Sequence, residues 1–267
     1  MCPPDYFGIE YEINPWMQGN IGQAHHATAI KQWQALYKIL KKHDKVELIP
    51  AQPKLPDMCF AANAGLVSGN TFIPARFKFK ERQGEEAHFI KWFQEKNYTI
   101  KELPKNIYFE GEGDALFQSD ESLLWVGYGM RTDIASHDLL KKILNVEVVS
   151  LHLTNPHYYH LDTCFIPLPG KRAVYYADAF DEASLKKLRD YFPEKSRLEL
   201  TPADASLFAC NAIVCDDLFI CNNLSQTLEL KLREWGFYAE RIPMSEFMLA
   251  GGAAKCLVLK LSQENNI

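Results

Sequence analysis

Residues 63–75 read NAGLVSGNTFIPA, an asparagine followed by an apolar run, a turn signal at 68–70 and a second apolar run. Two short apolar segments joined by Ser, Gly and Asn are typical of a β-hairpin. The same order recurs in DALFQSDESLLWVGYG (114–129), DTCFIPLPGKRAVYYAD (162–178) and NAIVCDDLFICN (211–222). A last apolar run, CLVLKL at 256–261, has no return strand after it.

A polar residue or a cysteine opens each of these segments. These marker residues are Asn63, Asp114, Asp162, Asn211 and Cys256. Their successive spacings are 51, 48, 49 and 45 residues. A period close to fifty residues, with one pattern per unit, indicates a repeat architecture.

Segments with the apolar periodicity of a helix follow the hairpins, and each leads into one more short strand pattern. We expect helices around 89–93, 139–144, 185–192 and 228–235, followed by strands in YTIKEL, VEVVSLHL, SRLELT and YAERIPM. An earlier helix is expected over 27–42, leading into a strand in KVELIP at 45–50. The predicted unit is therefore hairpin–helix–strand, present about five times.

The fifth hairpin could be completed by pairing YFGIEYEI at 6–13 with CLVLKL at 256–261. Such pairing would join the two chain ends and close a ring. No Ser/Gly-rich linker or low-complexity tract interrupts the series, so we predict one domain over 1–267. The alternative is a plain α/β sandwich in which the spacing is accidental.

Composition narrows the functional classes. The chain has 267 residues, of which 47% are hydrophobic and 24% charged, the balance of a globular protein with a sizeable core. A net charge of −5 argues against a nucleic-acid partner, because phosphate binding needs a basic surface. The N-terminus lacks the pattern of a secretory signal, and no stretch approaches the ~20 apolar residues that span a bilayer, so no membrane association is expected.

The cysteine pattern bears on compartment and metal binding. Seven cysteines at irregular spacing, without any CxxC pair, fit neither a disulfide framework nor a zinc ribbon. We therefore expect a reducing cytoplasm and no metal site.

In a ring, the polar residues at the start of each hairpin would converge on the central axis. The side chains expected to face one cavity in this way are Asn63, Glu110, Asp114, His160, Asp162 and Cys256. A site of this kind needs no local motif, only the same place in each unit.

Cys256 follows the small-residue loop AGGAA and precedes an apolar strand pattern. Glycine permits the close approach of a ligand. A nucleophilic cysteine must ionise, which needs nearby positive charge, and Lys255 or a cationic substrate could supply it. The alternative is a structural cysteine buried at the start of a strand, which is the commoner case for a lone cysteine.

Histidine and carboxylate residues recur in two further segments. His160 and Asp162 are two residues apart, which on a strand puts both side chains on one face. Such a pair can shuttle a proton and bind a cation, or it can be a core histidine beside a surface aspartate. In FEGEGD at 109–114, carboxylates alternate with glycines without the spacing of an EF-hand. Carboxylate oxygens match the donor fork of a guanidinium, although a solvated turn is the simpler reading.

Together these segments resemble the guanidino-group modifying, or amidinotransferase, superfamily. The matching strings are NPWM (14–17), PDMCFAANAGLV (56–67), FEGEGD (109–114), GYGMRTD (127–133), HLDTCF (160–165) and SEFMLAGGAAKC (245–256). They span nearly the whole chain in the family's order. The superfamily includes arginine deiminases, dimethylarginine dimethylaminohydrolases, glycine amidinotransferases and arginine or succinylarginine dihydrolases. Its fold is a five-bladed α/β propeller of ββαβ modules, which agrees with the repeat read from the pattern.

The resemblance implies a role for each matching residue. Cys256 would be the nucleophile, His160 the general acid and base, and Glu110 the third catalytic residue. The residues implied to bind the substrate are Asn63, Asp57, Asp114, Arg131 and Asp162. Of these, Arg131 would bind the substrate carboxylate, and Asp162, with Glu110, would hold the guanidinium.

The chain departs from the family pattern at two places. The family's GGG appears as Ala250-Gly251-Gly252. Glu112 stands between two glycines, so that either Glu110 or Glu112 could be the carboxylate of the site. We prefer Glu110 because it fits the FEGxGD pattern.

Asn63 points to a branch of the family. Deiminases and dimethylarginine hydrolases usually have an aspartate here, whereas an asparagine is typical of the dihydrolases. An amide both donates and accepts, so it can bind a neutral ureido group as well as a guanidinium. We therefore predict a dihydrolase that converts arginine to ornithine, ammonia and carbon dioxide through a covalent amidino-thioether.

Other functions remain open at this point. They are a one-step hydrolase giving citrulline, an amidinotransferase, and a non-catalytic arginine-binding propeller. No metal or organic cofactor is expected, the expected partner is a small guanidino compound, and the sequence is compatible with a homo-oligomer.

Overall fold

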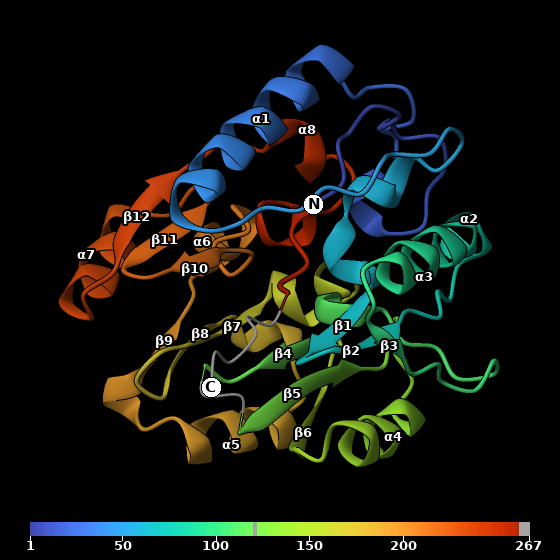
Figure 1. Ribbon diagram of the computed structural model, residues 1–267. Coiled ribbons are helices and arrows are strands. Elements are labelled where there is room, and N and C mark those ends of the chain that lie inside the picture. Colours follow the sequence, from blue (N-terminus) through green and yellow to red (C-terminus); the bar gives the residue numbers. More distant parts are fainter. Residues whose placement is uncertain (120–121, 262–267) are drawn as a thin grey trace.

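A computed structural model describes residues 1–119 and 122–261 of the chain (Figure 1). The described residues have a mixed α/β fold whose named strands form four three-stranded sheets, each from three consecutive strands. The strand bounds are Gly65–Ser68, Thr71–Pro74 and Thr99–Ile100 (β1–β3), Ala115–Phe117, Leu123–Tyr128 and Glu147–His152 (β4–β6), Phe165–Leu168, Arg172–Tyr175 and Arg197–Glu199 (β7–β9), and Ile213–Cys215, Leu218–Cys221 and Tyr238–Arg241 (β10–β12).

Every sheet has the same topology. The first two strands pair antiparallel and the third is parallel to the second. A parallel neighbour needs a crossover connection, and a helix supplies it in each unit. These helices are α3 (Glu85–Glu95), α4 (Ala135–Leu144), α5 (Glu182–Tyr191) and α7 (Gln226–Glu234). The predicted hairpin–helix–strand unit is therefore confirmed four times.

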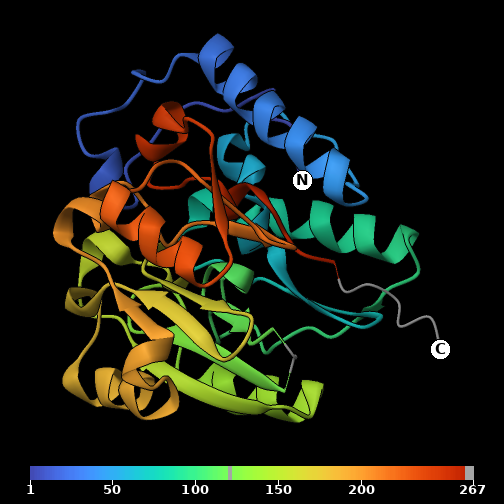
Figure 2. The same ribbon diagram turned by 90° about the vertical axis from the view of Figure 1, so that its left-hand side faces the viewer.

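The remaining helices complete the outer layer and the loops. They are α1 (His26–His43), α2 (Lys80–Gln83), α6 (Pro202–Ser206) and α8 (Ser245–Met248). In Figure 1, α1, α3, α4, α5 and α7 follow one another round the edge of the molecule in chain order. In Figures 1 and 2 the red C-terminal segment lies beside α1, where Gln32 Nε2 donates to Ser245 Oγ over 2.8 Å.

The first, third and fourth hairpin turns form where the sequence predicts them. Ser68 pairs with Thr71, which leaves Gly69 and Asn70 as a two-residue loop. Gly69 has φ +51°, a conformation that favours glycine. The second turn was predicted over 119–122, and its residues 120 and 121 lie outside the described residues.

A short 3₁₀ helix precedes each of the first three hairpins, and a fourth contains the last marker, Cys256. Their bounds are Ala61–Ala64, Gly111–Gly113, Leu161–Thr163 and Lys255–Leu257. The first contacts the second and the fourth, and the second also contacts the third. Segments that are far apart in the sequence therefore meet at the centre of the molecule, as the repeat predicts.

Two expectations about the chain ends do not hold. Residues 45–50 are extended without a strand ladder, so the predicted strand is wrong there; Ile49 N donates to Met1 O over 3.1 Å. Within the described part of the chain, neither 6–13 nor 256–261 carries a strand, and the predicted pairing of the two ends is not seen. The ends meet through side chains instead, because Cys2, Ile49 and Leu259 share one apolar cluster.

The reason for the missing ladder lies in competing bonds. Lys255–Leu257 is a 3₁₀ helix rather than a strand, and Lys260 N donates to the Glu112 carboxylate over 3.1 Å. Near the other end, Ile9 O accepts from Gly22 N over 2.9 Å. Backbone groups that a closing ladder would use are thus already bonded elsewhere.

None of the helices in the described residues combines the length and apolar composition that a membrane span requires.

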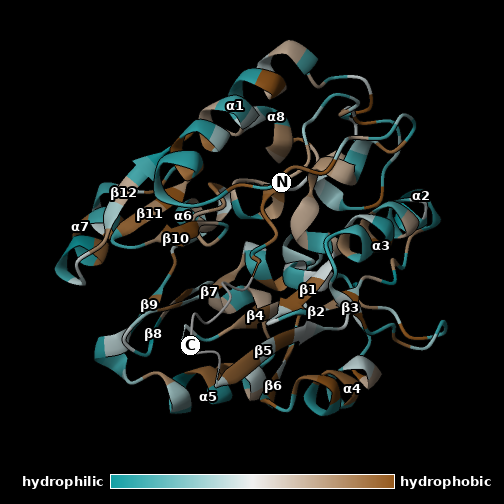
Figure 3. Cartoon of the chain, viewed as in Figure 1, coloured by the Kyte–Doolittle hydropathy of each residue, from teal (hydrophilic) through white to brown (hydrophobic). Residues whose placement is uncertain are grey.

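The apolar core lies between the strands and the outer helices. In Figure 3 strand β5 is largely brown, whereas helices α1 and α7 carry many teal residues. Trp125 on β5 is fully buried, and its ring lies 5.4 Å from that of Phe165 and 5.3 Å from that of Phe192. Both partners belong to the next unit, so this contact couples two units.

We expect Trp125→Ala to lower the free energy of unfolding by about 3–5 kcal/mol, the cost of a large aromatic cavity. Chemical denaturation measures the change. Leu230→Ala on α7 is the control, because that side chain is 54% exposed, and should cost little. Equal losses for the two variants would contradict the proposed coupling between units.

Candidate active site

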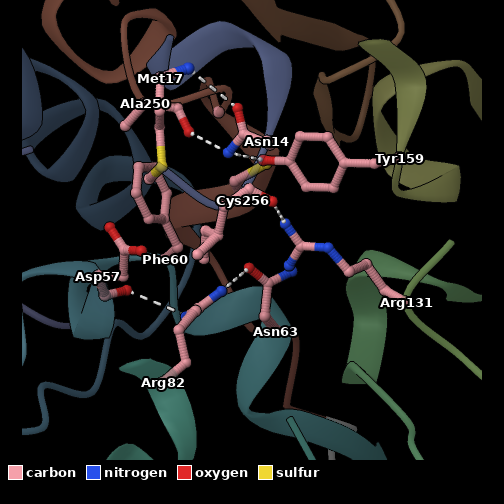
Figure 4. Close-up of a pocket in the computed structure, with 12 residues that line it drawn as sticks. Asn14, Met17, Asp57, Phe60, Asn63, Arg82, Arg131, Tyr159, Ala250 and Cys256 are labelled. Atoms are coloured by element: carbon pink, nitrogen blue, oxygen red, sulfur yellow. Dashed lines mark hydrogen bonds between the residues drawn. The ribbon is translucent and has the colours of Figure 1, made fainter. Parts of the chain in front are cut away.

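A small pocket lies where the central loops and 3₁₀ helices meet (Figure 4). Its lining combines polar and apolar side chains. The lining residues are Ile13, Asn14, Met17, Asp57, Phe60, Asn63, Arg82, Arg131, Tyr159, Ala250, Gly252 and Cys256. Four of the residues singled out in the sequence, Asp57, Asn63, Arg131 and Cys256, are therefore brought together here.

Cys256 lies in the last 3₁₀ helix and is held by two side chains. Asn211 Nδ2 donates to Cys256 Sγ over 3.1 Å, and the sulfur donates to Asp162 Oδ2 over 3.4 Å. The Cys256 backbone N–H donates to Asn211 Oδ1 over 3.2 Å. Cys256 is thus fixed in direction rather than loosely packed in a core.

Burial controls the protonation of this pair. It raises the pKa of the Cys256 thiol well above its usual range, and the nearby Asp162 carboxyl adds to the effect. Burial also raises the pKa of Asp162 to about 7, although Lys255 opposes the shift. At neutral pH the thiol therefore keeps its proton until a positive charge arrives.

His160 and Arg131 share one carboxylate. His160 Nε2 lies 2.7 Å from Glu110 Oε2, and Arg131 Nη1 donates to the same oxygen over 3.1 Å. Burial on its own favours the neutral carboxyl, but Arg131 and His160 outweigh it and hold the pKa of Glu110 well below its usual range. Glu110 is therefore ionised and orients the imidazole.

Glu112 has a different environment from Glu110. Its Oε2 accepts from Lys255 Nζ over 2.7 Å and from Lys260 N over 3.1 Å. It ties the C-terminal segment to the second unit. Among the described residues it bonds neither His160 nor Arg131. The geometry favours Glu110 over Glu112 as the site carboxylate.

Asn63 is oriented by a buried arginine. Arg82 Nη1 donates to Asn63 Oδ1 over 2.7 Å, while Glu85 accepts two bonds of 2.8 Å from the same guanidinium. In Figure 4, Arg82 and Arg131 approach Asn63 from opposite sides. Because Oδ1 is taken, Asn63 presents its Nδ2 as a free donor.

Three buried polar atoms in or beside the pocket have no hydrogen-bond partner among the described residues. They are Asn63 Nδ2, Asp57 Oδ1 and Asp162 Oδ1. Asn63 and Asp57 line the pocket, whereas Asp162 does not and contacts the sulfur of Cys256. An unpaired buried polar atom costs about 1–3 kcal/mol, so a ligand that pairs all three gains affinity from them. The vacant bonds are one donor and two acceptors.

The other oxygens of the acidic residues are engaged in the fold. Asp57 Oδ2 accepts from Tyr11 over 3.0 Å, and burial raises the pKa of Asp57. Asp114 accepts from Thr132 Oγ1 over 2.6 Å and from Leu161 N over 3.0 Å. Asp114 thus makes its bonds to the fold and does not line the pocket, so its substrate-binding role stays a prediction.

Sequence reasoning missed several residues that the structure brings to the site. They are Asn14, Arg82, Glu85, Tyr159 and Asn211. Asn211 carried a signal, since it is the fourth marker of the repeat. Arg82 and Glu85 carried none, because charged side chains three residues apart usually face the solvent.

Comparison with known proteins identifies the family. A model of the eukaryotic N,N dimethylarginine dimethylhydrolases matches residues 3–263. The chain belongs to this family. The resemblance read from the sequence is therefore confirmed.

Two curated relatives are similar to nearly the whole of this chain. The bifunctional arginine dihydrolase/ornithine cyclodeaminase ArgZ of Synechocystis is 46% identical over 98% of this chain and 37% of its own length. The chain thus spans little more than a third of that relative. The N(G),N(G)-dimethylarginine dimethylaminohydrolase of Mycobacterium tuberculosis is 33% identical over 98% of this chain and 84% of its own length.

Solved structures superpose on most of this chain. The N-terminal domain of ArgZ, in a mutant form bound to substrate, superposes with a TM-score of 0.97, 46% identity and coverage of 98% and 97% of the two chains. A second structure of that domain holds a covalently bound reaction intermediate, with the same TM-score, identity and coverage. A dimethylarginine dimethylaminohydrolase adduct, 20% identical, shares the fold with a TM-score of 0.75 over 88% of this chain and 92% of the other.

Across residues 1–119 and 122–261, no cluster of three or more His, Cys, Asp or Glu side chains is arranged to hold a metal ion.

The close approach of Asn63 and His160 depends on Gly113. A methyl group added at Gly113 would overlap Asn63 Nδ2 and lie 3.2 Å from the His160 ring. We expect Gly113→Ala in this family member to reduce kcat/KM roughly 10²-fold, the effect of misplacing reacting groups by about 1 Å.

Steady-state kinetics on the guanidino compounds that the family resemblance implies as substrates measures the loss. Gly8→Ala is the control, because nothing lies within 4 Å of the added methyl group there. A Gly113→Ala protein with unchanged kcat/KM would show that the packing of Asn63 and His160 is not tight.

Proposed function

We propose that this chain is a cysteine-dependent hydrolase of the guanidino group of arginine, and specifically an arginine dihydrolase that releases ornithine, ammonia and carbon dioxide. The observation that carries the proposal is the set of unpaired atoms around Cys256. Asp57 Oδ1 and Asp162 Oδ1 need donors, which a guanidinium has, and Asn63 Nδ2 needs an acceptor, which a ureido oxygen provides.

The relatives support the same conclusion. The bifunctional proteins of Synechocystis and Nostoc, each 46% identical over 98% of this chain, are named arginine dihydrolases. They are much longer than this chain, so any further activity they combine with arginine hydrolysis is outside the proposal.

Binding of the substrate prepares the nucleophile. The guanidinium brings a positive charge beside Cys256 and Asp162, and this charge favours the thiolate that burial otherwise disfavours. Arg131 lines the pocket, where its guanidinium lies 4.5 Å from the rings of Phe79 and Tyr159. In this proposal Arg131 receives the substrate carboxylate by exchanging part of its bonding to Glu110 and Ile13 O.

The first round consists of two displacements. The Cys256 thiolate adds to the guanidino carbon, and ammonia departs with a proton from His160, which leaves an amidino-thioether. His160, oriented by Glu110, then takes a proton from water as the water adds to that carbon. The C–S bond breaks, and a ureido product, citrulline, is formed.

The second round repeats the chemistry on a neutral group. Cys256 adds to the ureido carbon, a second ammonia leaves, and hydrolysis of the thioester-like intermediate gives a carbamate that loses carbon dioxide. Asn63 supports this round because its free Nδ2 can donate to the ureido oxygen. An aspartate in its place would present oxygens that accept and repel that oxygen.

A one-step hydrolase giving citrulline from arginine or dimethylarginine is the second candidate. The family model and the mycobacterial relative, whose names refer to dimethylarginine, favour it. Asn63 distinguishes the two candidates, since only the dihydrolase needs to retain a neutral product for a second attack.

The remaining parts of the proposal concern architecture and context. We infer a closed five-bladed α/β propeller and one catalytic domain over 1–267, supported by four ββαβ units that all supply residues to one site and by the packing of Cys2 against Leu259. A cytoplasmic location, assembly into a homo-oligomer and the lack of a nucleic-acid partner stay predictions.

Product analysis tests the proposed function. With arginine we expect ornithine and two ammonia per turnover, whereas citrulline with one ammonia would select the second candidate. Cys256→Ser should abolish turnover, and Cys215→Ser should not, because Cys215 is a free, partly exposed thiol outside the pocket. Full activity of Cys256→Ser would reject the nucleophile.

We expect Asn63→Asp to shift the products from ornithine toward citrulline by at least about tenfold, because the ureido oxygen loses a donor and meets a carboxylate. Chromatography of both products from one reaction measures the ratio. The ratio is its own control, since loss of folded enzyme lowers both products equally. An unchanged ratio would remove Asn63 from the account of the second round.

A further inference from the structure

Asn211 occupies the fourth marker position of the repeat and is fully buried. It lies at the start of the fourth hairpin, just before β10, where the other units place Asn63, Asp114 and Asp162. Its side chain does not line the pocket; it lies against the sulfur of Cys256. The repeat therefore delivers a polar group to the reacting sulfur in this unit as well.

Both atoms of the Asn211 amide are engaged, and their contacts fix which way round it lies. Oδ1 accepts the backbone N–H of Cys256 over 3.2 Å. Nδ2 donates to Cys256 Sγ over 3.1 Å and to Asp162 O over 3.2 Å. A flipped amide would set its NH₂ group against the Cys256 N–H and its oxygen against the Asp162 carbonyl, so only the observed orientation satisfies all three contacts.

The backbone before Asn211 is unusual. Phe208 is a buried, bulky residue with φ +57°, and its carbonyl accepts from Asn211 N over 2.9 Å. Left-handed backbone at a large side chain persists where the surroundings demand it, often at functional sites. The turn that delivers Asn211 to the sulfur is thus held in a costly conformation.

We propose that Asn211 is a catalytic residue whose amide N–H stabilises the Cys256 thiolate each time it forms and each time it leaves. The inference rests on the proposed function in that it takes Cys256 as the nucleophile. It adds a residue that the family resemblance did not assign.

The sulfur alternates between three states in this scheme. In the resting thiol, the S–H donates to Asp162 Oδ2 and the sulfur accepts from Asn211. On ionisation the proton passes to Asp162 Oδ2, and the electron pair stays on sulfur, where the Asn211 N–H faces it. The pair then forms the C–S bond to the substrate carbon.

The same contact operates when the C–S bond breaks. Water adds to the carbon, the electron pair returns to sulfur, and the thiolate again faces the Asn211 N–H. The backbone N–H of Ala253 also bonds the sulfur and lowers its pKa, so Asn211 is the side-chain member of a pair of donors. Conversion of arginine to ornithine requires the thiolate to leave twice, so the Asn211 N–H stabilises the departing thiolate in both rounds.

The pH dependence of Cys256 alkylation tests the proposal without relying on turnover. Iodoacetamide is added to the whole protein across a pH series, and modification of Cys256 is followed by peptide mass. We expect Asn211→Asp, which has the same shape but loses the N–H and can add a negative charge, to raise the apparent pKa of Cys256. Below that pKa, alkylation at a fixed pH should slow at least about tenfold.

Asn222 offers a matched control in the same unit. Its Nδ2 donates to Leu207 O over 3.1 Å and its Oδ1 accepts from Met244 N over 2.9 Å, so it also bridges two segments through both amide atoms. It does not line the pocket. Asn222→Asp should change thermal stability and leave the alkylation profile of Cys256 as in the unmodified chain.

The outcomes separate this inference from the proposed function. A folded Asn211→Asp protein with an unchanged alkylation profile overturns the role of Asn211. Turnover of arginine by Cys256→Ser would instead overturn the nucleophile itself. If Asn211→Asp does not fold, Asn211→Ser and Asn211→Ala replace it in the test. A lower apparent pKa of Cys256 in the serine variant than in the alanine variant supports a hydrogen-bond donor at this position. Identical alkylation profiles of the two variants oppose it.

Discussion

The burial of two arginine side chains in the middle of the chain is the constraint on which the rest of the structure depends. Arg82 is paired with Glu85 and Arg131 with Glu110, and all four side chains are at most 4% exposed. Breaking such a pair leaves an uncompensated buried charge, at a cost of about 3–5 kcal/mol. Each arginine also binds a backbone carbonyl from another segment, Asp57 O or Ile13 O. These ion pairs and carbonyl bonds therefore fix the two arginine side chains that line the pocket.

The repeat was predictable because its signals are local. A turn sequence between two apolar runs specifies a hairpin from a few residues, and helical periodicity specifies the crossover that follows. The closing segments were not predictable in this way, because their outcome depends on non-local competition. The N–H of Lys260 bonds the Glu112 carboxylate of another unit, and residues 255–257 form a 3₁₀ helix around the cysteine. No sequence pattern within 256–261 predicts this hydrogen bond or this 3₁₀ helix.

The candidate site followed from the repeat for the same reason. Glu110, His160, Asp162 and Cys256 open or flank hairpins, so a shared place in the unit brought them together. Arg82 lies on a short helix outside any marker position, and its role depends on Asn63 and Glu85. Asn211 was marked by its spacing, but a lone asparagine has no distinctive chemistry. Its role is visible only in the structure, where its amide contacts the sulfur of Cys256, 45 residues later in the chain.

The charges of the site fit the two groups of the proposed reaction, first a cationic guanidinium and then a neutral ureido group. Buried carboxylates around the pocket outnumber the two guanidinium groups, and burial raises the pKa of Asp114 to about 6 and of Asp162 to about 7. In the proposed reaction, the guanidinium of the substrate relieves this imbalance and pairs the free oxygens of Asp57 and Asp162. Hydrolysis to a ureido group removes the charge, and a site of carboxylates alone would then release the product. The amide of Asn63 keeps a donor available to the new oxygen, so the same pocket can hold both reactants.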